Sequence, residues 1–443
     1  MILRATFDNI LSFNHETQIS FVAGKGSLHP DHVNRAEKRD DISVLRAGII
    51  YGANASGKSN FIKAIRFLQL LVLGKSPFSE METFKSGKDR RPVSKIELEI
   101  KLNKRYFAYG VEFNIRGIKE EWLFEINDRS DRKIYTRRVL DSGNEFEFGE
   151  IDGNSETKMF LKFLGESTPL DRTFISEYVK RNGKGMEDIR SVHNWFLREL
   201  KIIFPHTRYK GLSVRAERDA DFQKATKDLL KHFNTGITDI RRIRIRSKED
   251  TGLPDDVLER IEKDCNNGES VMLASSSDND VFFFERKDDG SLVIYKQIAV
   301  HGYGEFETKF EMDEESDGTI RLLDFIPMLI DLRRNPVVYL IDELDRSMHP
   351  MMTYEIIKSF LSNLNINIES QIIFSTHESN LLDLDLMRSD EVWFVEKDRE
   401  GASHFSSLAE YKPRADVRKG YLQGRYGAVP FFATPDNLKW DKV

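Results

Sequence analysis

The chain has few of the residues that could cross-link it or anchor it in a membrane. It contains one cysteine, Cys265, in 443 residues. A single cysteine excludes both a disulfide framework within the chain and a CxxC metal site, and it suits a reducing compartment. No apolar run approaches the roughly 20 residues that cross a bilayer, and the start of the chain lacks the charged-then-apolar pattern of a secretion signal. We therefore expect a cytoplasmic protein without a membrane partner.

An excess of positive charge is also absent. Lys and Arg number 67 against 73 Asp and Glu, which gives a formal net charge of -6. Such a chain has no global attraction to nucleic acid, so any contact of that kind must come from a local patch. The sequence has no sustained heptad pattern, which excludes long coiled-coil arms, and no internal repeat. Its length leaves room for about two or three domains.

A glycine-rich stretch near the start, "YGANASGKSN", has the spacing of a phosphate-binding P-loop. The apolar "RAGII" before it predicts a buried strand, and "NFIKAIRFLQLLVL" after it has helical periodicity. The N–H groups of such a loop and of the first helical turn bind a triphosphate. Lys58 would reach the terminal phosphates, and the Ser59 hydroxyl would bind Mg²⁺. The residues predicted to contact ATP here are Gly52, Asn54, Ala55, Ser56, Gly57, Lys58, Ser59 and Asn60.

A second stretch with catalytic character, "NPVVYLIDELDRSMHP", lies about 280 residues further on. Its apolar run predicts a strand that ends in two carboxylates. Asp342 would hold the magnesium ion through water, and Glu343 would orient or deprotonate the attacking water. The alternative is that these are ordinary acidic residues of a loop after a strand.

The next predicted strand ends in "QIIFSTHESN" and places His377 at the carboxyl edge of the same sheet, where ligands bind in open α/β sheets. His377 is predicted to sense the γ-phosphate. A purely structural histidine is the alternative.

A further helix start lies in "EESDGTIRLLDFIPMLIDL". Ser316 is suited to cap this helix, and Gly318 lies in its first turn, so this end can also donate N–H groups to an anion. In a head-to-tail dimer this end would close over the nucleotide of the partner. The alternative is an ordinary helix N-cap.

The pattern along the chain suggests three parts. Residues 1–167 contain the P-loop and, from residue 93 to about 150, a period-two pattern typical of an antiparallel β meander. Residues 168–267 are predicted to be mainly helical and to form an insert or lid. Residues 268–443 alternate apolar strands with helices, which is typical of a mostly parallel sheet.

The order of these motifs resembles that of ABC-type ATPases, in the branch of the SMC chromosome proteins. "YGANASGKSN" looks like Walker A, "ESDGTIRLL" like a divergent signature, "VVYLIDE" like Walker B, "LDRSMHP" like the D-loop and "STHESN" like the H-switch. The resemblance implies an α/β P-loop NTPase of ABC/SMC-head type with a mostly parallel sheet, an antiparallel β subdomain and a helical insert. It also implies a nucleotide contact from Asp345 in the D-loop.

The resemblance extends to the stand-alone bacterial phage-defence ATPases of the AbiL and Rlo type, with relatives in Septu and PARIS systems. "FDNILSF", "EESDGTIRLLD", "IDELDRSMHP" and "GRYGAVPFF" carry it. It implies an ATPase that assembles through ATP into at least a dimer and controls a separately encoded toxin or nuclease. Two features depart from the pattern, since Asp317 replaces the glycine of transporter signatures and residues 172–182 contain no Q-loop glutamine.

Three other functions fit parts of the sequence. A transporter subunit is disfavoured, because it would be a compact domain of roughly half this length. A nuclease of the overcoming-lysogenization type is also disfavoured, because it would need its own catalytic domain and only 66 residues follow His377. A DNA-binding repair ATPase has its best support in "DIRRIRIRSK", where Arg242, Arg244 and Arg246 would share one strand face suited to a phosphate backbone. A solvated face of an amphipathic strand is the alternative interpretation of that stripe.

Overall fold

Contacts between Cα atoms group the chain into two compact units in this computed structural model. Unit 1 consists of Met1–Pro205, Asn335–Leu344 and Ile357–Val443, and unit 2 of His206–Arg334 and Asp345–Ile356. The structure describes residues 1–26, 28–36, 42–85, 91–245, 251–266, 270–274, 280–362, 364–365, 367–413 and 416–429. The three-part division at residues 167 and 267 stays a prediction.

A six-stranded sheet forms the centre of unit 1. Its strands, in spatial order, are β11 (Leu200–Ile203), β17 (Val338–Ile341), β18 (Gln371–Ser375), β5 (Ala47–Tyr51), β19 (Val392–Lys397) and β20 (Ser403–Ser407). The first five strands are parallel and β20 is antiparallel. All residues of β17, β18 and β5 are buried, which explains why each contains consecutive apolar residues.

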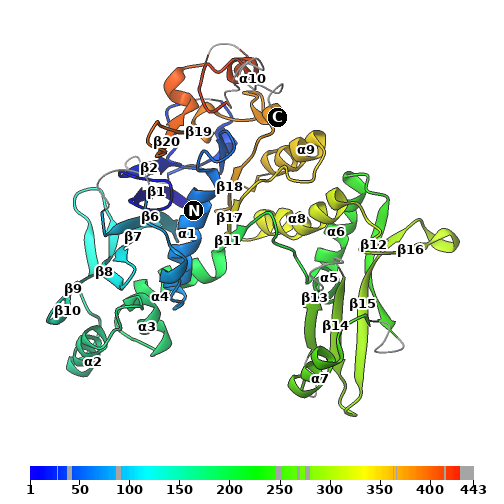
Figure 1. Cartoon of the computed structure of the whole chain (residues 1–443), viewed down its shortest axis with the longest axis horizontal. Helices are drawn as coiled ribbons and strands as arrows, with labels where there is room; N and C mark the ends of the chain where they lie inside the picture. The colour runs from blue at the N-terminus through cyan, green and yellow to red at the C-terminus, as the bar shows by residue number, and fades with distance from the viewer. Residues whose placement is uncertain are drawn as a thin grey trace, which may run out of the picture. The chain divides into compact units, whose positions relative to one another are not determined.

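The register of the three central strands positions the candidate site. Ile341 of β17 is paired with Phe374 of β18, and Ser375 of β18 is paired with Ile50 of β5. Because these pairings are parallel, the carboxyl ends of the three strands lie at one edge of the sheet. Figure 1 labels β17 and β18 next to each other.

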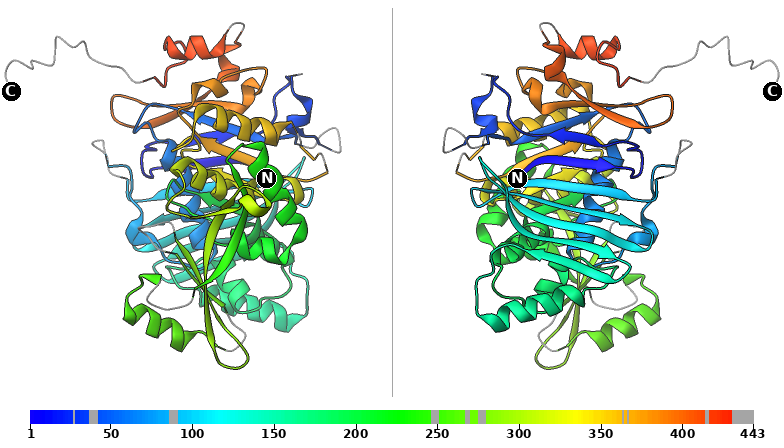
Figure 2. Two further views of the ribbon diagram at one scale, coloured as in Figure 1. Left: turned by 90° about the vertical axis from the view of Figure 1, so that its right-hand side faces the viewer. Right: turned by 90° about the vertical axis from the view of Figure 1, so that its left-hand side faces the viewer.

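A seven-stranded sheet with antiparallel pairings is the second layer of unit 1. Its order is β10 (Gly143–Phe148), β9 (Arg132–Leu140), β8 (Gly117–Ile126), β7 (Arg105–Asn114), β6 (Ser94–Leu102), β1 (Ile2–Asp8) and β2 (Thr17–Ser20). The right-hand view of Figure 2 shows the cyan strands of this sheet side by side. In the first part of β6 buried and partly exposed residues alternate, and the meander predicted from the period-two pattern is confirmed.

Helix α1 (Lys58–Val72) supplies apolar side chains to the same hydrophobic core as the two sheets of unit 1. Phe61, Ile65 and Leu68 are fully buried there, at the helical spacing seen in the sequence. Further α-helices of unit 1 are α2 (Ser155–Glu166), α3 (Phe174–Lys180), α4 (Glu187–Asn194) and α10 (Val417–Leu422).

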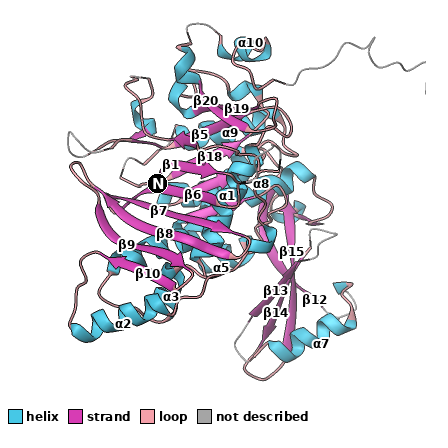
Figure 3. Cartoon of the chain, turned by 60° about the vertical axis from the view of Figure 1, so that its left-hand side comes forward, coloured by secondary structure: helices cyan, strands magenta, loops and turns pink. Residues whose placement is uncertain are grey.

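Unit 2 has an antiparallel sheet of its own. Its order is β12 (Ile237–Ile245), β15 (Leu292–His301), β14 (Val281–Arg286) and β13 (Ser270–Ala274), with β16 (Thr308–Glu311) also paired to β15. Its helices are α5 (Leu212–Arg218), α6 (Ala220–His232), α7 (Asp255–Asp264) and α8 (Asp317–Arg334), and α9 (Pro350–Leu361) passes from unit 2 to unit 1. Figure 3 distinguishes these helices from the strands by colour.

The segment predicted to be mainly helical, residues 168–267, also contains strands β11 and β12. β11 has only four residues, and its parallel pairing with β17 is a tertiary interaction that local periodicity does not report. Within the described ranges, no helix combines the length and the apolar character needed to span a bilayer.

Candidate nucleotide-binding site

The P-loop connects β5 to α1, as the sequence predicts. Gly57 has φ +119°, and a Cβ there would lie 2.9 Å from the Ser403 Cβ. A Cβ on Gly52 would lie 2.6 Å from the Val395 carbonyl oxygen. Both positions therefore require glycine. At Gly57 the positive φ and the close approach of β20 disfavour a side chain, and at Gly52 the close approach of β19 does so.

Lys58 begins α1, and its side chain turns back over the loop. Its Nζ donates to the carbonyl oxygens of Gly52 at 2.8 Å and of Ala53 at 3.1 Å. The residue is 6% exposed. A buried ammonium on the inner side of a glycine loop is the charge that a terminal phosphate needs.

A set of serines outside the predicted motif holds the loop from behind. The Ser403 hydroxyl donates to the Ser56 carbonyl oxygen at 2.6 Å and lies 2.7 Å from the Ser12 hydroxyl. Asn60 donates to the same Ser12 hydroxyl at 2.8 Å. Ser12 and Ser403 are 391 residues apart in sequence, so no local pattern could have identified them. Asn54 and Ala55 are exposed at the tip of the loop.

The predicted Ser59 and Asp342 meet at the edge of the sheet. The Ser59 hydroxyl donates to Asp342 Oδ1 at 3.1 Å, and Asp342 is 3% exposed. Both side chains offer the hard oxygen atoms that Mg²⁺ prefers, and neighbouring ligands of an octahedral Mg²⁺ lie about 3 Å apart. The two residues therefore fit a magnesium ion, which would bridge the phosphates of a bound nucleotide and neutralise their charge.

Ser375, which the sequence analysis missed, completes this edge. It is the last residue of β18 and is fully buried. Its hydroxyl donates to Asp342 Oδ1 at 2.7 Å and accepts from the Glu343 N–H at 2.8 Å. Its position directly before "TH", at the end of an apolar run, is the signal that could have identified it.

Glu343 and His377 follow the carboxyl ends of neighbouring strands. Glu343 is partly exposed and has φ +52°, a left-handed conformation that a residue with a side chain adopts only at a cost. His377 is exposed, two residues beyond β18. Both therefore lie at the sheet edge where ligands of α/β proteins bind.

The predicted residues of unit 2 form a separate local arrangement. Ser316 is exposed, and its hydroxyl accepts from the Thr319 N–H at 3.1 Å, which is the N-cap geometry of α8. A Cβ on Gly318 would lie 2.9 Å from the Ser347 carbonyl oxygen. Gly318 thus allows the segment of Ser347, which lies two residues after the partly buried Asp345, to approach the first turn of α8 closely.

The predicted arginine stripe is not a free row of cations. Arg242 forms ion pairs with Glu217 and with Glu285, the latter at 2.7 Å. Its guanidinium also lies over the Phe283 and Tyr295 rings. These two carboxylates raise its pKa, although burial alone would lower it. Arg244 is exposed, and Arg246 lies outside the described residues.

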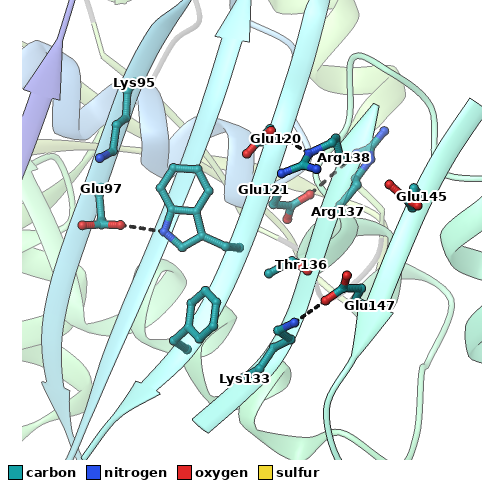
Figure 4. Close-up of a pocket in the computed structure, with 12 residues that line it drawn as sticks. Lys95, Glu97, Glu120, Glu121, Lys133, Thr136, Arg137, Arg138, Glu145 and Glu147 are labelled. Atoms are coloured by element: carbon teal, nitrogen blue, oxygen red, sulfur yellow. Dashed lines mark hydrogen bonds and ion pairs between the residues drawn. The ribbon is translucent and has the colours of Figure 1, made fainter. Parts of the chain in front are cut away.

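A hollow of about 480 Å³ lies against the seven-stranded sheet of unit 1. Figure 4 shows Lys95 and Glu97 on one side of it and Arg138 and Glu147 on the other. Glu97 accepts from the Trp122 indole N–H at 2.6 Å, and burial raises the pKa of its carboxyl. Lys133 is paired with Glu147, and Arg138 with Glu120. Since these cations are matched by carboxylates, the hollow is poorly suited to a phosphate.

Two of three comparisons with known proteins give matches. A protein-family model described as "AAA domain, putative AbiEii toxin, Type IV TA system" matches residues 49–383. Among the solved structures that match is the SMC head domain from Thermotoga maritima, with 13% identity, a TM-score of 0.40, and coverage of 92% of this chain and 98% of that chain. Comparison with curated proteins gives no match.

The family model spans more than half of the chain and includes the P-loop lysine, the acidic pair and His377. The chain therefore belongs to the AAA-domain family that carries the AbiEii, type IV toxin–antitoxin description.

Proposed function

We propose that the chain binds and hydrolyses ATP with Mg²⁺. The observation that supports this most is the 3.1 Å hydrogen bond between the Ser59 hydroxyl and Asp342 Oδ1, next to the buried Lys58 ammonium. This bond joins segments 283 residues apart and brings a hydroxyl and a carboxylate to the start of α1, the helix that Lys58 begins. A metal–triphosphate complex uses all three.

In this proposal each residue of the edge has one task. The loop from Gly52 to Gly57, with Asn54, Ala55 and Ser56, surrounds the phosphates, and Asn60 keeps the start of α1 in place. Lys58 neutralises the terminal phosphates, and Ser59 and Asp342 hold the ion that bridges them. Glu343 accepts a proton from the attacking water, and His377 contacts the γ-phosphate.

We further propose that two copies assemble head to tail when ATP is bound. Ser316 and Gly318 at the start of α8 would donate N–H groups to the γ-phosphate of the other copy, and Asp345 would line the same junction. The exposure of Ser316 and Asp317 at the start of α8 supports this proposal. Two equivalent sites would give a closed twofold arrangement.

The biological role that we propose is an engine or sensor in bacterial anti-phage defence, within the AbiL and Rlo branch, acting in the cytoplasm. Support comes from the family description, which names a toxin of a type IV toxin–antitoxin system, and from the motif resemblance. Loss of the γ-phosphate on hydrolysis would open the assembly and change what a separately encoded toxin or nuclease contacts. A repair ATPase that binds DNA has weaker support, because Arg242 is bound to two carboxylates.

The experiment that tests this role is purification of Glu343→Gln, expressed together with its neighbouring genes, in ATP and in ADP. We expect one neighbouring protein to co-purify in a nucleotide-dependent amount. Equal recovery in both nucleotides, or recovery of none, would contradict effector control while leaving ATP hydrolysis to be judged by itself.

A further inference from the structure

The carboxylate pair at the end of β17 is held by one residue of the neighbouring strand. Ser375 contacts three consecutive residues of the acidic segment. Its hydroxyl donates to Asp342 Oδ1 at 2.7 Å and accepts from the Glu343 N–H at 2.8 Å, and its carbonyl oxygen accepts from the Leu344 N–H at 3.0 Å.

The hydroxyl of Ser375 can make these two bonds in only one way. A serine hydroxyl has one hydrogen to donate, and it goes to Asp342, whose carboxylate can only accept. The N–H of Glu343 can only donate. The orientation of the Ser375 hydroxyl is therefore fixed, and so is its place between the two acidic residues.

The backbone of Glu343 needs such support. At φ +52° a residue with a side chain is in a sparsely populated conformation that costs of order 1 kcal/mol or more and persists only where neighbours hold it. The bonds from the Glu343 and Leu344 N–H groups to Ser375 flank this residue. They determine the direction in which the Glu343 side chain leaves the backbone.

Asp342 Oδ1 is shared by two hydroxyls, Ser59 at 3.1 Å and Ser375 at 2.7 Å. Ser375 is fully buried and Ser59 is partly exposed. The buried bond fixes the rotation of the carboxylate, while Ser59 remains on the side toward the P-loop. A residue that orients a metal-binding carboxylate in this way typically affects metal affinity or activity 10- to 100-fold.

We propose that Ser375 is a positioning residue that sets both the magnesium-binding carboxylate of Asp342 and the general base Glu343. This inference rests on the proposed ATP hydrolysis at the same site. The Ser375 hydroxyl aligns the metal ligand Asp342 with the base Glu343. Loss of this hydroxyl therefore affects both the metal dependence and the rate of turnover.

The test compares Ser375→Ala with Ser370→Ala. Ser370 is also buried, at 1% exposed, and lies directly before β18, yet among the described residues its hydroxyl has no hydrogen-bond partner. ATP turnover is measured against Mg²⁺ concentration, and the melting temperature is measured with a non-hydrolysable ATP analogue as Mg²⁺ is added.

For Ser375→Ala we expect kcat to fall about 10- to 100-fold and the Mg²⁺ concentration for half-maximal turnover to rise about 10-fold or more. The melting-temperature response to Mg²⁺ should move to higher concentration in the same variant, and Ser370→Ala should follow the parent in each measurement. Ser375→Thr, which keeps the hydroxyl, should recover part of the metal affinity.

Parent-like kcat and Mg²⁺ dependence in folded Ser375→Ala would overturn the assignment. So would an equal loss in Ser370→Ala, because the effect would then belong to packing. If Ser375→Ala does not fold, Ser375→Thr is compared with Ser375→Cys, because threonine keeps the hydroxyl and a thiol is only a weak donor. Equal metal affinity in these two variants would also overturn the assignment. A parent protein that binds no nucleotide would refute the proposed function instead.

Discussion

The Ser59 hydroxyl and the Asp342 carboxylate form a hydrogen bond of 3.1 Å although 283 residues separate them in sequence. The parallel order β17-β18-β5 makes this possible, because it brings the ends of strands from distant segments to one edge. The P-loop and the acidic pair are thus one site in space.

Lys58→Ala should abolish measurable ATP binding, since the ammonium supplies the charge for the terminal phosphates. Because Lys58 also binds the Gly52 and Ala53 carbonyl oxygens, we expect a small additional loss of about 1 kcal/mol in the free energy of unfolding. Nucleotide titration and thermal melting would be measured together. Lys63→Ala, at an exposed position of the same helix, is the control, and ATP affinity like that of the parent in folded Lys58→Ala would refute the P-loop assignment.

Ser316→Arg should permit ATP binding by each copy but block closure and turnover. Ser316→Ala is the matched control, because it removes the N-cap bond to Thr319, worth about 1 kcal/mol, without adding bulk. The distance between copies is measured in the Glu343→Gln background with a label on an introduced cysteine, Glu400→Cys, at an exposed site. The native Cys265 is buried, so the label reacts mainly with the introduced cysteine. An ATP-induced distance change that Ser316→Arg leaves intact would contradict the head-to-tail model.

Arg242→Glu should lower the free energy of unfolding by about 2 kcal/mol, because it places a third carboxylate beside Glu217 and Glu285. Arg244→Glu, on the same strand but exposed, should change stability little. Chemical denaturation checks both variants. If Arg244→Glu instead removes a strongly salt-dependent DNA affinity of the parent, the stripe binds nucleic acid after all.

Stability in acid should depend on Glu125, which bridges Arg105 and Arg132 at 2.5 and 2.7 Å. The hydrogen bond from Arg105 lowers the pKa of this carboxyl below its ordinary value of 4.5. A lowered pKa in the folded state adds stability that is present above pH 4.5 and is lost as the pH falls through the folded-state pKa. Glu125→Gln should therefore reduce the pH dependence of unfolding below pH 4.5, and an unchanged pH profile would show that the bridge contributes nothing.

Sequence reasoning predicted the elements whose signal is local. The glycine spacing of the P-loop, the apolar runs of β5, β17 and β18 and the alternation in β6 follow directly from residue order. It missed Ser12, Ser375 and Ser403 because serine is common at strand ends and in loops, and only tertiary pairing brings these hydroxyls together. The pattern left Arg242 open either as part of a phosphate-binding stripe or as part of a solvated face, because its partners Glu217 and Glu285 come from elements that the pattern did not place beside it.

In the proposed mechanism, Asp342 binds the metal ion and Glu343 activates the water. Measuring ATP binding and ATP turnover in Glu343→Gln and Asp342→Ala tests it most directly. We predict that Glu343→Gln binds ATP as the parent does but loses turnover by at least about 100-fold, since an amide cannot accept the proton, and that Asp342→Ala loses the magnesium dependence of binding. Hydrolysis at the parent rate in Glu343→Gln, or unchanged magnesium dependence in Asp342→Ala, would contradict these roles of the two carboxylates.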